Sequence, residues 1–379
     1  MAKRGADYTP HPNWQPQPVF TPWDGLLAGV KTPDDWPARR ADIRRRFLEI
    51  LCADAAPQPP AQVDLRVEKE WAEDGYTVRR VSYLVEADER AHGYLAIPSG
   101  PKPAGGFPAV LCIHGTTNWG ARQTLGLLPE PGDTHGGRAI NGLDYARNLA
   151  QNGFVTLTAE HFCSATRCPA EGPYDTAAFY RKHPKWAAVG KSVYENRIGV
   201  GVLAALPEVN ASRIGATGHS LGGHNSFFLA ALDERVKCAV PCCAGPTIGQ
   251  NPDAVLWSRD FWYIYFPTLR AGLLKGAPPP VDFHEIFALA APTPMLEIFG
   301  FNDGDARMQT QRLAMHMRVH DVYRLLGREE AHAILVLGDG HSLPDQARTA
   351  QLAWLTRWLK HDGDPLGTWK ASPQPPSQR

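Results

Sequence analysis

Residues 213–223, Arg-Ile-Gly-Ala-Thr-Gly-His-Ser-Leu-Gly-Gly, join a short apolar strand pattern to a tight turn of the form Gly-x-Ser-x-Gly. A helical pattern follows at once in residues 225–232. This order of strand, serine turn and helix is the context in which the pentapeptide forms a nucleophile elbow, a strained turn that exposes a serine hydroxyl. Side chains at Gly218 and Gly222 would collide with neighbouring backbone in so tight a bend. The pattern therefore predicts that Ser220 is a nucleophile.

Strand and helix patterns alternate on both sides of this turn. Strands are expected at 76–85 and 93–98, as an antiparallel entry pair at a sheet edge, and then at 108–113, 154–159, 213–217, 236–240, 295–299 and 333–337. Helices are expected at 38–52, 142–151, 193–205, 225–232, 307–326 and 346–360. Such alternation predicts an α/β fold with a mainly parallel twisted sheet and helices on both faces.

The same patterns divide the chain into three parts. Residues 1–70 are expected to form an N-terminal arm and a helix that pack on the body. Residues 71–361 are expected to form the catalytic domain, with a lid-like insertion at 245–290. Residues 362–379 are expected to form a C-terminal tail that is disordered from Ser372 onward.

A serine nucleophile needs a base within hydrogen-bond reach and an acid that orients the base. His341 is the expected base, because it lies between the last strand and the last helix, at the sheet edge where the serine turn also emerges. Asp303 is the expected acid, since a carboxylate is held most firmly close to a strand end. Asp305 is an alternative, although it could equally cap the next helix, and Asp339 is a third candidate that is better suited to shaping its turn.

Two backbone N–H groups are expected to stabilise the oxyanion of a tetrahedral intermediate. One belongs to Leu221, the residue after the nucleophile, and the other to the loop that follows the strand at 108–113. Thr116 is the expected donor in that loop, with Thr117 as the alternative. His114 is expected to brace the loop through hydrogen bonds and not to act as a second base.

These motifs together resemble the α/β-hydrolase superfamily, and more narrowly its bacterial dienelactone-hydrolase-like and acetyl-xylan-esterase-like branch. The resemblance rests on His114-Gly115, Gly218 to Gly223, Gly300-x-x-Asp303, Gly340-His341, the lead-in at 206–215, the segment 290–296 and the helix with Trp36, Arg39 and Arg40. It covers residues 36–361 and implies an α/β-hydrolase fold with a Ser-His-Asp triad.

Three positions depart from the pattern of that branch. Dienelactone hydrolases carry a cysteine nucleophile, so Ser220 favours ordinary ester chemistry. Thr293 stands where an arginine is frequent, and Glu160-His161 stands where a turn containing Asp or Arg is common. The substrate pocket is therefore the least predictable part of the site.

Aromatic residues are the main candidates for substrate binding. The insertion at 245–290 carries an aromatic cluster that is expected either to cover the site as a lid or to pack on the body, with equal weight. Aromatic faces suit sugar rings as well as aryl and acyl groups. The residues expected to contact substrate are Trp119, His161, Trp257 and Trp262.

Composition excludes several other classes of function. The 379 residues carry no net charge, which argues against nucleic acid as a partner. No apolar run is long enough to cross a membrane, and the first residues lack the apolar stretch of a signal peptide, so a cytoplasmic location is expected. The seven cysteines are expected to be reduced. A metal site of His161, Cys163 and Cys168 matches no strong zinc pattern, so no metal or cofactor is expected.

The sequence thus predicts a cofactor-free serine carboxylesterase. Its expected substrates are small acyl esters, acetylated carbohydrates among them, cleaved through an acyl-enzyme. A serine peptidase or amidase of the same fold is one alternative. A non-catalytic binding protein of the hydrolase fold is another, although such proteins typically lose a triad member. The sequence does not predict the oligomeric state.

Overall fold

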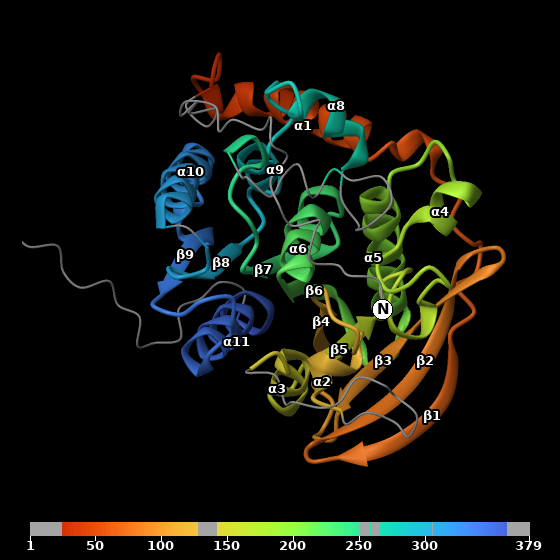
Figure 1. Cartoon of the computed structure of the whole chain (residues 1–379). Coiled ribbons are helices and arrows are strands. Elements are labelled where there is room, and N and C mark those ends of the chain that lie inside the picture. Colours follow the sequence, from red (N-terminus) through yellow and green to blue (C-terminus); the bar gives the residue numbers. More distant parts are fainter. Residues whose placement is uncertain (1–24, 128–141, 251–257, 259–265, 305, 362–379) are drawn as a thin grey trace, which may run out of the picture.

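The computed structural model describes residues 25–127, 142–250, 258, 266–304 and 306–361 (Figure 1). Its described part contains a nine-stranded sheet with the strand order β1-β2-β3-β5-β4-β6-β7-β8-β9. The strands are β1 (Arg66–Glu73), β2 (Tyr76–Glu86), β3 (Glu89–Pro98), β4 (Phe107–Ile113), β5 (Val155–Ala159), β6 (Val209–His219), β7 (Val236–Cys242), β8 (Met295–Gly300) and β9 (His332–Leu337).

The sheet is parallel from β5 to β9 and antiparallel at the other end. β1, β2 and β3 pair antiparallel with one another, and β3 pairs antiparallel with β5. The remaining neighbours, from β5 through β4, β6, β7 and β8 to β9, are parallel. All seven residues of β4 are buried, as expected for a strand covered on both faces. The prediction of a mainly parallel sheet with an antiparallel entry pair is confirmed.

β1 is an edge strand that the sequence did not predict. Seven of its eight residues are exposed, so it lacks the apolar alternation by which a half-buried strand is recognised. Its pairing runs from Arg66 with Ser82 to Glu73 with Tyr76, and it extends the entry pair outward by one strand. β1 also crosses the expected boundary between residues 70 and 71.

Helices cover both faces of the sheet. They are α1 (Trp36–Ile50), α2 (Arg122–Leu125), α3 (Tyr145–Gln151), α4 (Ala177–Lys182), α5 (Ala188–Ala205), α6 (Leu221–Leu232), α8 (Arg270–Leu273), α9 (Phe283–Leu289), α10 (Ala306–Leu325) and α11 (Asp345–Lys360). Short 3₁₀ helices lie in the connections: η3 (Pro33–Asp35), η4 (Ala53–Ala55), η5 (Ala165–Arg167), η6 (Ile248–Gln250), η7 (Pro267–Leu269) and η8 (Glu329–Ala331). None of the described helices combines the length and apolarity that a bilayer span requires.

Two apolar layers hold the helices to the sheet. One layer lies between the sheet and α1, α5, α6, α9 and α10, and the other lies between the sheet and α2, α3 and α11. Figure 1 shows the arrangement of these helices around the sheet. Phe227 and Phe228 of α6 are central to the first layer, where Phe227 stacks on Phe287 of α9 and Phe228 meets Phe47 of α1. Each such buried ring contributes roughly 1.5–3 kcal/mol. This packing fixes α6, and with it the serine turn at its start.

Candidate active site

Ser220 lies at the junction between β6, which ends at His219, and α6, which begins at Leu221. Its backbone has φ 59° and ψ −118°, a strained conformation for a residue with a side chain. Two hydrogen bonds hold it there: the Ser220 amide donates to the Cys242 carbonyl at 2.9 Å, and the Ser220 carbonyl accepts from the His224 amide at 3.0 Å. The structure therefore has the geometry of a nucleophile elbow at this serine.

Close backbone approaches explain the glycines around the turn. A Cβ on Gly222 would lie 1.8 Å from the Ile113 carbonyl oxygen at the end of β4. A Cβ on Gly218 would lie 2.4 Å from the Gly222 backbone. A Cβ on Gly115 would lie 3.4 Å from the Ser220 Cβ, which places the loop after β4 directly beside the elbow.

Asp303 and His341 meet at the same edge of the sheet. Asp303 follows β8 and His341 follows β9, and the His341 Nδ1 lies 3.0 and 2.9 Å from the two carboxylate oxygens of Asp303. The His341 ring also packs against the ring of His219, the residue before the nucleophile, with centroids 4.6 Å apart. These contacts bring the expected base and acid together next to the serine turn.

The loops that carry the acid and the base are joined to each other. Asn302 donates its backbone amide to the Asp339 carbonyl at 3.0 Å and its side-chain amide to the Gly338 carbonyl at 2.5 Å. A Cβ on Gly300 would lie 2.2 Å from the Asp339 oxygen, so the two loops touch through backbone. Asp339 thus contributes its carbonyl to the turn. Asp305, the alternative acid, lies outside the described residues.

The carboxyl of Asp303 is electrostatically suited to orient a histidine. Burial alone would raise the pKa of Asp303, but the hydrogen bond from His341 and the attraction to His341 and Arg312 outweigh it and lower that pKa. The carboxyl is therefore ionised at neutral pH. The Asp303 side chain is 18% exposed, whereas that of His341 is 48% exposed and can reach a bound molecule.

Hydrogen bonds with Tyr174 and His161 hold the loop after β4, which is expected to supply the second oxyanion donor. The Thr117 amide donates to the Tyr174 hydroxyl at 2.8 Å, so this alternative donor is already engaged. The His161 amide donates to the His114 Nε2 at 3.2 Å, and the His161 Nε2 donates to the His114 carbonyl at 2.9 Å. His114 in turn donates from Nδ1 to the Gly115 carbonyl at 2.7 Å.

His161 has a different environment from the one expected of a substrate-binding residue. Its side chain is buried, its Nε2 is held by the His114 carbonyl, and burial lowers the pKa of His161 to about 4. It therefore remains neutral and supports the loop from within. Glu160, beside it, is also buried and accepts from the Thr166 amide at 3.0 Å.

The other expected substrate contacts are only partly described. Trp119 is half-buried in the loop after β4, where its amide donates to the Thr117 hydroxyl at 3.2 Å. Trp257 and Trp262 lie outside the described residues, so the aromatic lid stays a prediction. Phe266, a described member of that cluster, is buried against Phe228 and packs on the body.

Arg312 and Cys243 belong to the surroundings of the site, although the sequence did not predict them. Arg312 of α10 is 2% exposed, donates to the Ala244 carbonyl and lies over the Phe299 ring at 4.4 Å. Cys243 follows β7 and is 3% exposed. An arginine on an amphipathic helix and a cysteine after an apolar strand carry no local pattern that places them beside a triad.

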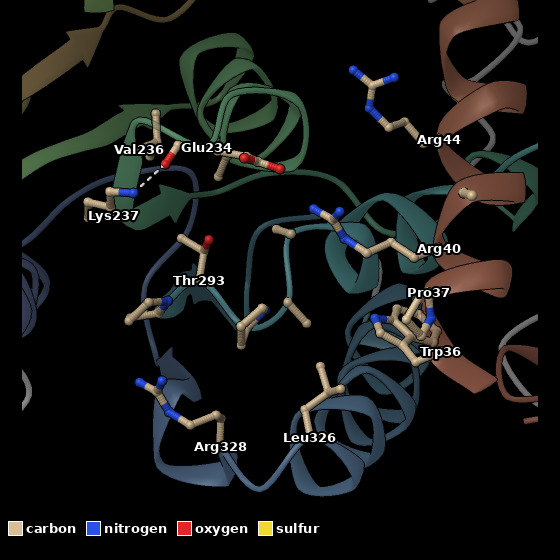
Figure 2. Close-up of a pocket in the computed structure, with 16 residues that line it drawn as sticks. Trp36, Pro37, Arg40, Arg44, Glu234, Val236, Lys237, Thr293, Leu326 and Arg328 are labelled. Carbon is tan, nitrogen blue, oxygen red and sulfur yellow. Dashed lines mark hydrogen bonds between the residues drawn. The ribbon is translucent and has the colours of Figure 1, made fainter. Parts of the chain in front are cut away.

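The groove drawn in Figure 2 lies at the opposite end of the strands. It has a volume of about 650 Å³ and is lined by Arg40 and Arg44 of α1, by Lys237 at the start of β7 and by Thr293 just before β8. Ser220, by contrast, follows the carboxyl end of β6. Thr293 therefore does not face the serine. This is the position at which dienelactone-hydrolase-like and acetyl-xylan-esterase-like proteins often have an arginine.

All seven cysteines lie in the described part of the chain, and no disulfide joins any of them there. Cys163 is buried and Cys168 is exposed. Among the described side chains, the group that brings three metal-ligating atoms together does not include His161, Cys163 or Cys168.

The chain is similar in sequence to several known proteins. Residues 133–252 match the model of the dienelactone hydrolase family. A Bacillus subtilis protein named as a hydrolase, YtaP, is 24% identical over 341 residues, which cover 84% of this chain and all of that protein. The acetyl esterase Axe7A of Xylanibacter ruminicola is 22% identical over 81% of this chain and 65% of its own length.

Solved structures are similar to this chain over most of its length. A glucuronoyl esterase from Solibacter usitatus superposes with a TM-score of 0.65 over 86% of this chain and 94% of its own, at 15% identity. With the parallel sheet, the strained serine turn and the loop order described above, this likeness shows that the chain has the α/β-hydrolase fold.

Proposed function

We propose that this chain is a serine esterase in which Ser220, His341 and Asp303 form the catalytic triad. The observation that carries the proposal is the contact between His341 Nδ1 and both carboxylate oxygens of Asp303, at the sheet edge where the strained Ser220 turn emerges. The esterases among the sequence relatives and structural neighbours support the ester-hydrolase class.

The proposed reaction follows from the roles of these groups. Asp303 holds the His341 Nδ1–H, which leaves Nε2 to accept the Ser220 proton as the hydroxyl attacks the ester carbonyl. The oxyanion of the tetrahedral intermediate accepts hydrogen bonds from the Leu221 amide, in the first turn of α6 where backbone donors lack partners within the helix, and from the Thr116 amide. His341 then protonates the leaving alkoxide, and water hydrolyses the acyl-enzyme by the same steps in reverse.

We assign carbohydrate esters as the substrate class. Axe7A is named as an acetyl esterase, and the Solibacter neighbour is named as a glucuronoyl esterase. A carbohydrate ester can have either of two orientations: the sugar supplies the alcohol in an acetylated sugar and the acid in a uronate ester. The His341 side chain is 48% exposed and Trp119 is half-buried, and an aromatic face such as that of Trp119 suits a sugar ring.

The test compares the wild type with Ser220→Ala on p-nitrophenyl acetate. The wild type should hydrolyse this ester and react with a fluorophosphonate probe, and Ser220→Ala should lose both activities with an unchanged circular dichroism spectrum. Ser226→Ala is the matched control, because Ser226 is a buried serine in α6, the helix that follows Ser220, and its hydroxyl donates to the Gly223 carbonyl at 2.7 Å. It should keep both activities.

The alternatives give different results in the same assays. Cleavage of an aminoacyl-nitroanilide without hydrolysis of any short ester would establish a peptidase. A wild type that neither hydrolyses esters nor reacts with the probe would establish a binding protein. A panel of acetylated sugars and methyl uronates then determines which orientation of the carbohydrate ester the enzyme accepts.

A further inference from the structure

Three side chains with metal-ligating atoms meet beside the serine turn: His219, Cys243 and His341. One ring nitrogen of each histidine and the Cys243 Sγ all lie within 4.8 Å of one another. Within the described ranges of the chain, this is the one such group of at least three histidine, cysteine, aspartate or glutamate side chains. Ligands around a tetrahedral zinc ion, with Zn–N about 2.0–2.1 Å and Zn–S about 2.3 Å, are separated by similar but somewhat shorter distances.

The Nε2 atom of His219 is an independent sign of a missing ligand. The His219 residue is 5% exposed, and its Nε2 has no hydrogen-bond partner among the residues that the structure describes. An unsatisfied buried polar atom costs about 1–3 kcal/mol. Burial and the neighbouring His341 lower the pKa of His219 to about 3, so the ring is neutral and can donate a lone pair.

The backbone conformation of Cys243 and its contacts place the Cys243 thiol close to His219 and His341. Cys243 has φ 50°, and its amide donates to the Ile298 carbonyl of β8 at 2.7 Å. Its Sγ lies 3.7 Å from the Ser342 carbonyl, in the loop that carries His341. Cys242, the preceding residue, points to the other face of the sheet, where its sulfur meets the Gln351 side chain at 3.7 Å.

We propose that His219, Cys243 and His341 form an inhibitory binding site for Zn²⁺. Imidazole nitrogen and thiolate sulfur are the donors that zinc prefers in proteins, and three protein ligands leave the fourth position for water. Asp303 adds a negative charge near the site, since it interacts electrostatically with both His219 and Cys243. The inference goes beyond the proposed esterase activity and depends on it only for the reaction that is inhibited.

Binding would stop catalysis whichever nitrogen of His341 the ion takes. A metal on Nε2 blocks the transfer of the serine proton, and a metal on Nδ1 displaces Asp303. The Zn–S bond forms as the thiol loses its proton to solvent, and no group is oxidised or reduced. Because zinc displaces this proton, its binding at the site should weaken as the pH falls.

The first experiment measures inhibition of p-nitrophenyl acetate hydrolysis by ZnCl₂. The wild type should be inhibited and should recover on addition of EDTA. Cys243→Ala should keep its ester hydrolysis and require a Zn²⁺ concentration more than about tenfold higher for the same inhibition, since even the loss of an outer-shell partner costs about 10–100-fold in metal affinity. Cys242→Ala, the adjacent buried thiol, and Cys168→Ala, an exposed thiol, should keep wild-type sensitivity.

The second experiment observes the metal directly and needs no activity. Ser220→Ala titrated with Co²⁺ should show a thiolate-to-cobalt charge-transfer band in the near ultraviolet, and this band should be absent from Ser220→Ala/Cys243→Ala. Equal zinc inhibition of the wild type and Cys243→Ala, or no band with the cysteine present, would overturn the proposed metal site. If the wild type hydrolysed no ester, the proposed function would fail, and the cobalt band would still decide whether the site exists.

Discussion

Replacement of Gly222 by alanine tests how the elbow depends on backbone contact. A Cβ at this position would lie 1.8 Å from the Ile113 oxygen, whereas real Cβ atoms essentially never approach another heavy atom within 3.0 Å. The two backbones must therefore separate by about 1.2 Å, the difference between these two distances. Because β4 is held on both sides by β5 and β6, the start of α6 has to yield, and Ser220 moves with it.

Two effects of opposite sign set the expected magnitude. Alanine in place of a helical glycine favours the helix by about 1 kcal/mol. Overpacking of a close contact costs typically about 1–3 kcal/mol, and a misplacement of about 1 Å in a catalytic group can cost about 10²-fold in rate. We expect Gly222→Ala to lower kcat/KM for p-nitrophenyl acetate by at least about 10²-fold and to lower the free energy of unfolding.

The matched control is Gly201→Ala in α5. A Cβ there would meet only the tip of the Arg235 side chain, at 3.3 Å. This variant should keep wild-type kcat/KM and gain up to about 1 kcal/mol in a urea titration. Wild-type kcat/KM and stability in Gly222→Ala would refute the reasoning, because the added methyl group would then have been accommodated without moving the serine.

Three further predictions concern the acid and a buried group of charges. Asp303→Asn should lower kcat by about 10⁴-fold at neutral pH, because the amide favours the wrong His341 tautomer; a loss below tenfold in steady-state assays would contradict the triad. Arg167→Met should cost about 3 kcal/mol in a urea titration, the lower end for a broken buried pair, because the buried Glu195 loses the bidentate pair at 2.6 and 2.8 Å and keeps only Lys191, at 3.1 Å. Arg167→Met/Glu195→Met should recover most of that loss, and similar stability of the two variants would show that no unpaired charge was left. Burial alone would raise the pKa of Glu89, but Arg167 and Lys191 together lower it from 4.5 to about 2. The stabilisation, about 3 kcal/mol, is therefore fully present above pH 4.5 and is lost as the pH falls toward 2. Glu89→Gln should therefore show a smaller loss of stability over this interval in urea titrations at a series of pH values.

The central strands could be predicted because the apolar character of their own residues indicates burial on both faces. β4 is continuously apolar, since helices cover both of its faces, and a short window of sequence reveals this. β1 could not be predicted in the same way, because its exposed residues gain their strand conformation from pairing with β2. The short helix α9 was also missed, although Asp282 and Glu285 form a capping box at its start.

The residues of the candidate site likewise fall into two groups, those that the sequence predicted and those that it did not. Asp303 and His341 were predicted because each follows a recognisable strand, and strand ends share one edge of a parallel sheet. Arg312 and Cys243 reach the site only through the packing of α10 and β7 beside it. Their burial is a property of the assembled fold, so no local pattern in the sequence could place them there.

The position of Ser220 has a consequence for how the chain folds. Its strained backbone persists only while β6 is paired with β4 and β7, as in the contacts of Gly218 with Ile113 and with Pro241. The β4 pairing joins residues about a hundred positions apart, and parallel pairings of this kind form slowly because a long loop must close first. We therefore expect the serine turn to be among the last features to become native-like. During refolding, reactivity of Ser220 toward a fluorophosphonate should rise with the final cooperative phase and lag behind the far-ultraviolet circular dichroism, so that the nucleophile itself serves as a kinetic reporter of completed folding.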